Sequence, residues 1–123
     1  MDAYRIKRAL RDFRRVKTYQ KYLYPGKSPI QISDACKFLL DNCDSSFLFD
    51  EIIKAQDLKI LKGAKFQVWV LRRSKKDLSW ILSCQQNSDK KLLIRQIVEF
   101  RNFPIEEITI WLIDKVALLP SEH

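Results

Sequence analysis

The chain has 123 residues, 46% of them hydrophobic and 31% charged, and its formal net charge at pH 7 is +8. This length predicts one domain. No stretch of the sequence approaches the roughly 20 apolar residues that cross a bilayer. The N-terminal residues are charged from Arg5 onward, which is not typical of a secretory signal. Three cysteines do not fit a paired disulfide framework, so we expect buried, reduced thiols and a cytoplasmic protein.

Residues 3–23 are predicted to form one amphipathic helix. Apolar side chains such as Ile6, Leu10 and Phe13 recur at the three- and four-residue spacing of a buried helix face. The sequence Pro25-Gly26 is a strong stop signal, so we expect the helix to end just before it.

This predicted helix carries nearly all of the net charge. Residues 1–28 hold nine Lys or Arg against two Asp, whereas residues 29–123 hold fourteen Lys or Arg against thirteen Asp or Glu. We therefore divide the chain into a basic helix, residues 1–28, and a nearly neutral compact domain, residues 29–123. The two parts are expected to form one folding unit.

Two more helices are predicted before the sequence changes character. Ser33 is a suitable N-cap and Asp34 a favourable first-turn residue for the next helix. The polar run Asp44-Ser45-Ser46 interrupts that helix, and a third helix is predicted over residues 47–56.

From Lys65 onward the apolar residues alternate with a period of two, which is typical of strands. We expect three strands first, over residues 65–71, 78–84 and 92–100, with a turn at Asn87-Ser88-Asp89 between the second and the third. A helical turn is expected at Pro104, with Glu106 and Glu107. Two further strands are expected over residues 108–113 and 116–119. Helices followed by a meander of strands predict an α+β fold, in which the N-terminal helices pack on one face of a four- to five-stranded antiparallel sheet.

Several short runs are shared with one protein family. They are Ile32-Ser33-Asp34 leading into Phe38-Leu39-Leu40, Phe49-Asp50-Glu51-Ile52-Ile53 with Gln56, Phe66-Gln67-Val68-Trp69, Ser83-Cys84, Phe103-Pro104-Ile105-Glu106-Glu107-Ile108 and the end Leu118-Leu119-Pro120-Ser121-Glu122-His123. In these runs residues 31–123 resemble a family of small uncharacterised proteins of bacteria, phages and mobile elements, whose members usually end in an aromatic residue. Asp114-Lys115-Val116 stands where this family often has a Gly-containing turn.

The resemblance implies a context rather than an activity. Accessory genes of mobile elements often encode small binding proteins that block host defence nucleases or other host machinery. The basic helix of residues 1–28 lies outside the similar region.

No group of residues in the sequence is suited to catalysis or to metal binding. The one histidine, His123, is the last residue, and Cys36 and Cys43 have no further ligands nearby. Gly26 and Gly63 are too far apart for a Gly-rich phosphate loop. We therefore predict a protein that is not an enzyme and holds no metal or cofactor.

The basic segment is the main candidate for a binding site. Uncompensated positive charge of this density attracts a polyanion by its sign, although a solvated helix face is the alternative interpretation. A second basic cluster, formed by Arg72, Arg73, Lys75 and Lys76, precedes Asp77. This cluster is either a polar turn or, if it lies beside the first helix, the second half of a clamp on nucleic acid. The candidate contact residues are Arg5, Lys7, Arg8, Arg11, Arg14, Arg15, Lys17, Lys21, Arg72, Arg73, Lys75 and Lys76.

The three tryptophans are a further candidate for contact with nucleic acid. Trp69, Trp80 and Trp111 are of the type that stacks on bases in single-strand binders. Because aromatic residues on strands usually pack against helices, we expect at least two of the three in the core.

These features predict a binding protein that acts through its basic helix. The leading hypothesis is an inhibitor, encoded by a mobile element, that acts on a host protein or ribonucleoprotein complex such as an RNA-guided nuclease, with contacts from Arg8, Arg11, Arg14 and Arg15. The alternatives are direct, sequence-independent binding of RNA or DNA phosphates, a homo-oligomeric interaction module, and a helix that lies on a membrane surface. The sequence leaves the partner and the oligomeric state open.

Overall fold

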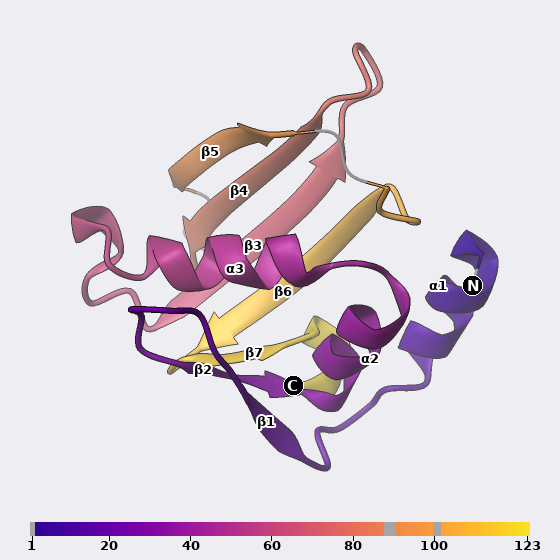
Figure 1. The fold of residues 1–123 in the computed structure, drawn as a ribbon, viewed down its shortest axis with the longest axis horizontal. Coiled ribbons are helices and arrows are strands. Elements are labelled where there is room, and N and C mark those ends of the chain that lie inside the picture. Colours follow the sequence, from indigo (N-terminus) through magenta and orange to yellow (C-terminus); the bar gives the residue numbers. More distant parts are fainter. Residues whose placement is uncertain (1, 88–90, 100–101) are drawn as a thin grey trace.

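A computed structural model describes residues 2–87, 91–99 and 102–123, and within them three helices accompany a seven-stranded sheet. Figure 1 shows α2 and α3 in front of the sheet and α1 beside one end of it. The elements in chain order are α1 (Ala3–Arg11), β1 (Tyr19–Tyr22), β2 (Ile30–Ser33), α2 (Asp34–Asn42), α3 (Ser46–Ala55), the 3-10 turn η1 (Lys59–Leu61), β3 (Phe66–Arg73), β4 (Trp80–Gln86), β5 (Leu92–Val98), β6 (Glu107–Ile113), β7 (Val116–Leu118) and the 3-10 turn η2 (Pro120–Glu122).

The sheet is mixed, and its strands run in the order β1-β2-β7-β6-β3-β4-β5. All neighbouring pairs are antiparallel except β2 and β7, which run parallel with Gln31 opposite Val116. The α+β class is confirmed, but a sheet of four to five antiparallel strands was wrong in strand number and in direction. The predicted meander is also wrong, because β6 lies beside β3 and the order β6-β3-β4-β5 is that of a Greek key. The two missed strands, β1 and β2, are four residues each, too short for a clear alternation of apolar side chains.

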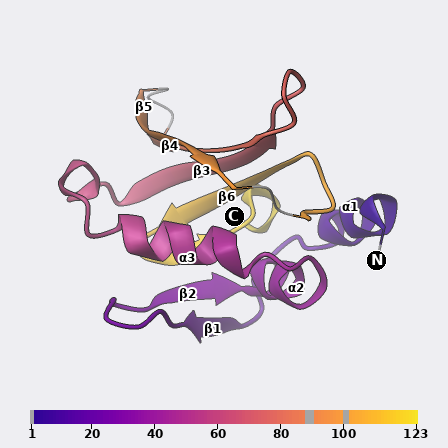
Figure 2. The same cartoon turned by 45° about the horizontal axis from the view of Figure 1, so that its top comes forward.

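One face of the sheet is covered and the other is not. Along β3 the side chains of Gln67, Trp69 and Leu71 are buried, whereas the alternate residues of the strand stay partly exposed. Figure 2 shows α2 and α3 together on one side of the sheet. Trp69 and Trp80 are each 1% exposed, which confirms that at least two tryptophans belong to the core.

The predicted helix over residues 3–23 is correct only in its first half. The helix α1 ends at Arg11, and Tyr19–Tyr22 pairs with β2, with Tyr19 opposite Ser33. Apolar residues at helical spacing continue to Leu23, but that side chain is 70% exposed. The N–H groups of Lys17 and Thr18 donate to the carboxylate of Asp34 instead of continuing a helix, and β-branched and aromatic residues in this stretch favour the extended backbone.

The segment around Pro25 is consequently a connection within the sheet. Residues 23–29 link the antiparallel strands β1 and β2, and Gly26 lies in the turn with a φ of 76°. That backbone conformation is one that glycine adopts at no steric cost.

The remaining helix predictions are close to the structure. Ser33 caps α2, because its Oγ accepts a hydrogen bond from the N–H of Cys36 at 3.3 Å. The helix expected over residues 47–56 is α3, displaced by one residue.

Two predictions in the β-rich half need correction. Leu78 is not in a strand: it lies in a left-handed turn conformation, with a φ of 61°, and is 56% exposed. No helical turn forms at Pro104; the backbone bends there, and the carbonyl of Glu106 accepts from the N–H of Arg73 at 2.9 Å, which extends the pairing of β6 with β3. Of the turn at residues 87–89, Ser88 and Asp89 lie outside the described residues, as does Phe100.

Strands β6 and β7 are joined by a two-residue turn. Asp114 and Lys115 have φ values of 48° and 66°, and Ile113 lies opposite Val116. Positive φ at both central residues matches the right-handed twist of the two strands. The turn therefore forms without a glycine at either central position.

The carboxylate of Glu122 joins the last turn of the chain to the start of α2. Glu122 is 4% exposed; its Oε1 accepts from the hydroxyl of Ser33 at 2.6 Å and from the N–H of Leu119 at 2.9 Å. Its Oε2 accepts from the N–H of Ala35 at 3.3 Å. A negative charge at the N-terminus of a helix is favoured by the unpaired N–H groups there, so this contact holds η2 against the junction of β2 and α2.

Glu122→Ala should lower the free energy of unfolding by about 2 to 4 kcal/mol, because it leaves buried donors without an acceptor. Glu122→Gln keeps one side-chain oxygen and should lose less. Urea denaturation measures both losses. The control Glu106→Ala, at an exposed position, should stay within about 0.5 kcal/mol of the wild type; an equally small change for Glu122→Ala would contradict the assigned role.

Candidate nucleic-acid interface

The helix α1 is fixed to the body of the protein by its apolar side. Asp2 caps the helix, since its Oδ1 accepts from the N–H of Arg5 at 2.9 Å. Ile6 is 0% and Leu10 8% exposed, and both belong to the hydrophobic core. The exposed side of α1 carries Arg5, Lys7, Arg8 and Arg11.

Asp34 holds the segment that follows α1. Its Oδ2 accepts from the N–H of Lys17 at 2.7 Å, both carboxylate oxygens lie 3.3 Å from the N–H of Thr18, and the hydroxyl of Thr18 also donates to it. These hydrogen bonds, led by that of the Thr18 hydroxyl, lower the pKa of Asp34. A surface loop is thus attached to the first residue of α2.

The attached segment and the two helices enclose a groove of about 900 Å³. The rings of Phe13 and Phe38 form an apolar part of its wall, with their centroids 5.7 Å apart. Arg14, Arg15 and Lys17 line the groove and are exposed. The arrangement combines an apolar wall with three cations that are open to solvent, and the carboxylates of Asp12 and Asp34 also line the groove.

Within the described residues, the cations from Arg5 to Lys21 form no ion pair. In the part of the chain that the structure describes there are three ion pairs: Lys27 with Asp57, Lys37 with Asp41 and Lys54 with Glu51. None of them involves the eight candidate contact residues of the N-terminal segment. Their charge is available to an external anion.

The structure does not bring all candidate residues together. Arg5, Lys7, Arg8, Arg11, Arg14, Arg15 and Lys17 lie on α1 or beside the groove, while Lys21 lies on the edge strand β1. The second cluster surrounds the β3–β4 hairpin, and in Figures 1 and 2 the segment before β6 lies between that hairpin and α1. The two clusters are therefore separate patches rather than two sides of one clamp.

Within the hairpin cluster, Arg73 differs from its neighbours. Its guanidinium lies over the ring of Trp80 at 5.7 Å from the centroid, and the side chain is half-buried. Arg72, Lys75 and Lys76 are exposed beside a shallow cavity of about 520 Å³ that also contains Glu106 and Glu107. With these two acids the four cations of the hairpin leave a local charge of +2. The seven cations of α1 and the groove stand beside three acids, Asp2, Asp12 and Asp34, which leaves +4. The hairpin patch is therefore the weaker candidate for a polyanion.

Base stacking by tryptophan is restricted to one residue. With Trp69 and Trp80 in the core, Trp111 remains, half-buried on the uncovered face of the sheet. Its ring centroid lies 5.2 Å from that of Phe66 and 5.5 Å from that of His123.

The cysteine thiols are inert in this fold. Cys36, Cys43 and Cys84 are all buried and free, as expected. Burial raises the pKa of Cys36 and of Cys84 to about 12 and also raises that of Cys43, so none forms the reactive thiolate at neutral pH. Among the described residues no three His, Cys, Asp or Glu side chains lie close enough together to hold a metal ion.

Two features of the groove were missed by sequence reasoning. Nothing in the sequence indicates that Asp34 binds the N–H groups of Lys17 and Thr18, which lie 17 and 16 residues away along the chain. The pairing of Phe13 with Phe38 is equally remote in sequence.

None of the helices in the described part of the chain has both the length and the apolar character that a membrane span requires.

The chain belongs to a family of unknown function (DUF6876), whose model matches residues 4–123. The match includes the basic N-terminal segment and so extends beyond the resemblance over residues 31–123. No curated protein and no solved structure matches the chain.

Acid should release the basic loop from Asp34. The pKa of Asp34 is below its ordinary value of 3.8, so the attachment is complete above that pH and is lost as the pH falls through the lower folded-state value. In amide NMR spectra, the Lys17 and Thr18 signals should then move toward their positions in Asp34→Ala. Identical signals for wild type and Asp34→Ala at pH 7 would exclude the attachment.

Proposed function

We propose that this protein is a binding protein that takes nucleic-acid phosphates, without sequence preference, on its N-terminal basic surface. This surface comprises the exposed cations of α1 and the groove lined by Arg14, Arg15 and Lys17. The observation that carries the proposal is that these cations are exposed and that, within the described residues, none of them has an ion-pair partner.

The anchoring of the surface supports binding rather than simple solvation. The helix α1 is buried through Ile6 and Leu10, and the loop is held by Asp34 through main-chain N–H groups. The cations are thus presented from a fixed backbone, which lowers the entropy lost when a ligand binds. Phosphate contacts of this kind give affinity and orientation but carry no sequence information.

Binding of a 20-nucleotide single strand should depend steeply on salt. Five or six phosphate contacts give a slope of log K on log salt of about −4.5 to −5.4 for a duplex and of about −3.5 to −4.2 for a single strand. The triple variant Arg11→Glu, Arg14→Glu, Arg15→Glu should lose at least about 100-fold in affinity and show a shallower slope. Fluorescence anisotropy over a series of salt concentrations measures both quantities.

The matched control is Lys59→Glu, Lys65→Glu, Lys91→Glu, which changes the net charge equally at exposed positions away from the groove. It should retain most of the affinity. Equal losses for the two triple variants would show that net charge alone attracts the nucleic acid and would overturn the assignment of the surface.

Inhibition of a host nucleic-acid-handling complex, such as an RNA-guided nuclease, stays a prediction. An inhibitor of this kind would bind its target through the same basic surface. Affinity capture of the tagged protein from host lysate, with and without nuclease treatment, separates the two possibilities. A protein partner that survives nuclease treatment and is lost with the Arg11, Arg14, Arg15 variant would favour inhibition. Nucleic acid alone, lost on nuclease treatment, would favour direct binding.

A second candidate function, a homo-oligomeric module, is favoured by the uncovered face of the sheet. Ile97 and Leu92 on the edge strand β5 are 67% and 50% exposed. On the same face, Phe66, Val68 and Trp111 form a second apolar group across β3 and β6, and Ser83 and Gln85 of β4 lie between the two groups. Apolar patches that extend over several strands often mark protein interfaces.

If two copies associate through this face, sedimentation velocity at micromolar concentration should show a dimer. Ile97→Lys should convert it to a monomer, because it places an unpaired charge in the interface. A monomer at all concentrations for the wild type would exclude the module.

A further inference from the structure

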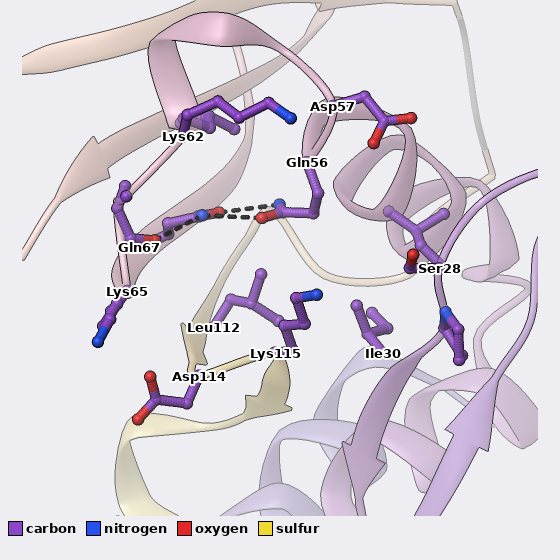
Figure 3. A pocket seen from close by; sticks show the side chains of 15 residues that line it. Ser28, Ile30, Gln56, Asp57, Lys62, Lys65, Gln67, Leu112, Asp114 and Lys115 are labelled. Atoms are coloured by element: carbon purple, nitrogen blue, oxygen red, sulfur yellow. Dashed lines mark hydrogen bonds between the residues drawn. The ribbon is translucent and has the colours of Figure 1, made fainter.

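A pocket of about 520 Å³ lies at one end of the sheet, away from the basic groove. It is bounded by the end of α3, the turn η1 and the starts of β2 and β3, together with the β6–β7 turn (Figure 3). Its volume is within the range of sites that hold small organic ligands.

The inner wall of the pocket is apolar and rigid. Ile30, Ile53, Leu61 and Leu112 all line it, and each side chain is at most 3% exposed. These residues come from four different elements and belong to the hydrophobic core, so the wall is formed by the packing of the fold itself.

A pair of glutamine side chains closes one side of the pocket. The amides of Gln56 and Gln67 donate to each other at 2.9 and 2.8 Å, as the dashed lines of Figure 3 show. Gln67 also accepts from the indole N–H of Trp69 at 2.9 Å and donates to the carbonyl of Ala64 at 2.9 Å. This network fixes the planes of both amides, which makes this side a flat and immobile surface.

The mouth of the pocket is positively charged. Figure 3 shows Lys62 extending toward Asp57, and Lys115 extending past Leu112 toward Ile30. Asp57 also accepts a hydrogen bond from Lys27 at 2.6 Å. This hydrogen bond does most to lower the pKa of Asp57, and the charges of Lys62 and Lys115 lower it further. Three lysines therefore surround one carboxylate, and the local charge is +2.

Two of these lysines are free to bind an anion. Within the described residues, neither Lys62 nor Lys115 forms an ion pair, whereas Lys27 is occupied by Asp57. Lys65 also lines the pocket, but in Figure 3 its side chain points away from it, as does that of Asp114. The charge of +2 matches a phosphate monoester, which carries about −1.5 to −2 at pH 7.

We propose that this pocket binds a phosphate monoester of nucleoside monophosphate size, with its uncharged ring on the apolar wall and its phosphate between Lys62 and Lys115. The ring lies against the partly exposed side chain of Gln56, whose plane is held by Gln67. The site is separate from the basic groove and does not depend on the function proposed for that groove.

The test is a titration of the ¹⁵N-labelled full chain with adenosine 5′-monophosphate, followed by amide NMR. Shifts should concentrate on residues that line the pocket. Lys62→Gln and Lys115→Gly should each weaken binding at least about tenfold, as expected for loss of a charge-assisted contact. Lys115→Gly suits the fold, because position 115 has a φ of 66°.

The matched control is Lys65→Gln, which removes a lysine beside the pocket that points away from it and should leave the affinity unchanged. Adenosine without phosphate should bind at least tenfold more weakly. The variant Arg11→Glu, Arg14→Glu, Arg15→Glu should bind adenosine 5′-monophosphate as the wild type does, which separates this site from the basic groove.

Two outcomes would overturn the proposal: no shifts at millimolar adenosine 5′-monophosphate, or shifts concentrated around Arg14 and Arg15 that this triple variant abolishes. A 5′-phosphorylated dinucleotide carries the same chemistry at the end of a strand. If it binds more tightly than the mononucleotide and remains sensitive to Lys62→Gln, the ligand is a strand end. If it binds more weakly, the ligand is a free nucleotide.

Discussion

The buried carboxylate of Glu122 joins parts of the chain that nothing local would bring together. It accepts hydrogen bonds from Ser33 and Ala35, which lie 89 and 87 residues earlier in the sequence. The N-terminus of α2 supplies the donors, and the carboxylate satisfies them where water is excluded. Because Ser33 ends β2 and also caps α2, this contact fixes the direction in which α2 leaves the sheet. The covered face of the sheet depends on that direction.

The same helix start also determines how the basic surface is held. Asp34 follows Ser33 directly, and its carboxylate binds main-chain N–H groups of Lys17 and Thr18. A carboxylate that paired with the arginine or lysine side chains would have neutralised them. Binding the backbone instead positions the loop and leaves the cationic side chains exposed. Attachment and charge are thus provided by different chemical groups of the same segment.

The elements that sequence reasoning predicted well are those with long, regular patterns. The alternation along β3 and the N-cap at Ser33 both depend on residues close in sequence, and both were found. The second half of the N-terminal helix was wrong because its extended backbone is stabilised by Asp34 and by pairing with β2, which local spacing does not reveal. The basic residues of the site could be named from composition, but the groove could not, since its wall joins Phe13 to Phe38. The pocket between Lys62 and Lys115 likewise arises from residues of separate elements.

The position of β7 in the sheet has a consequence for the order of folding. This strand lies between β2 and β6, so it joins the N-terminal hairpin to the four-stranded Greek key of β3 to β6. During synthesis, β1, β2 and the two following helices leave the ribosome long before Val116–Leu118 does. Until then β2 presents an unpaired edge, and such edges readily pair with other chains. Completion of the sheet is therefore a late, non-local step, of the kind that slows folding and leaves newly made chains most exposed to aggregation.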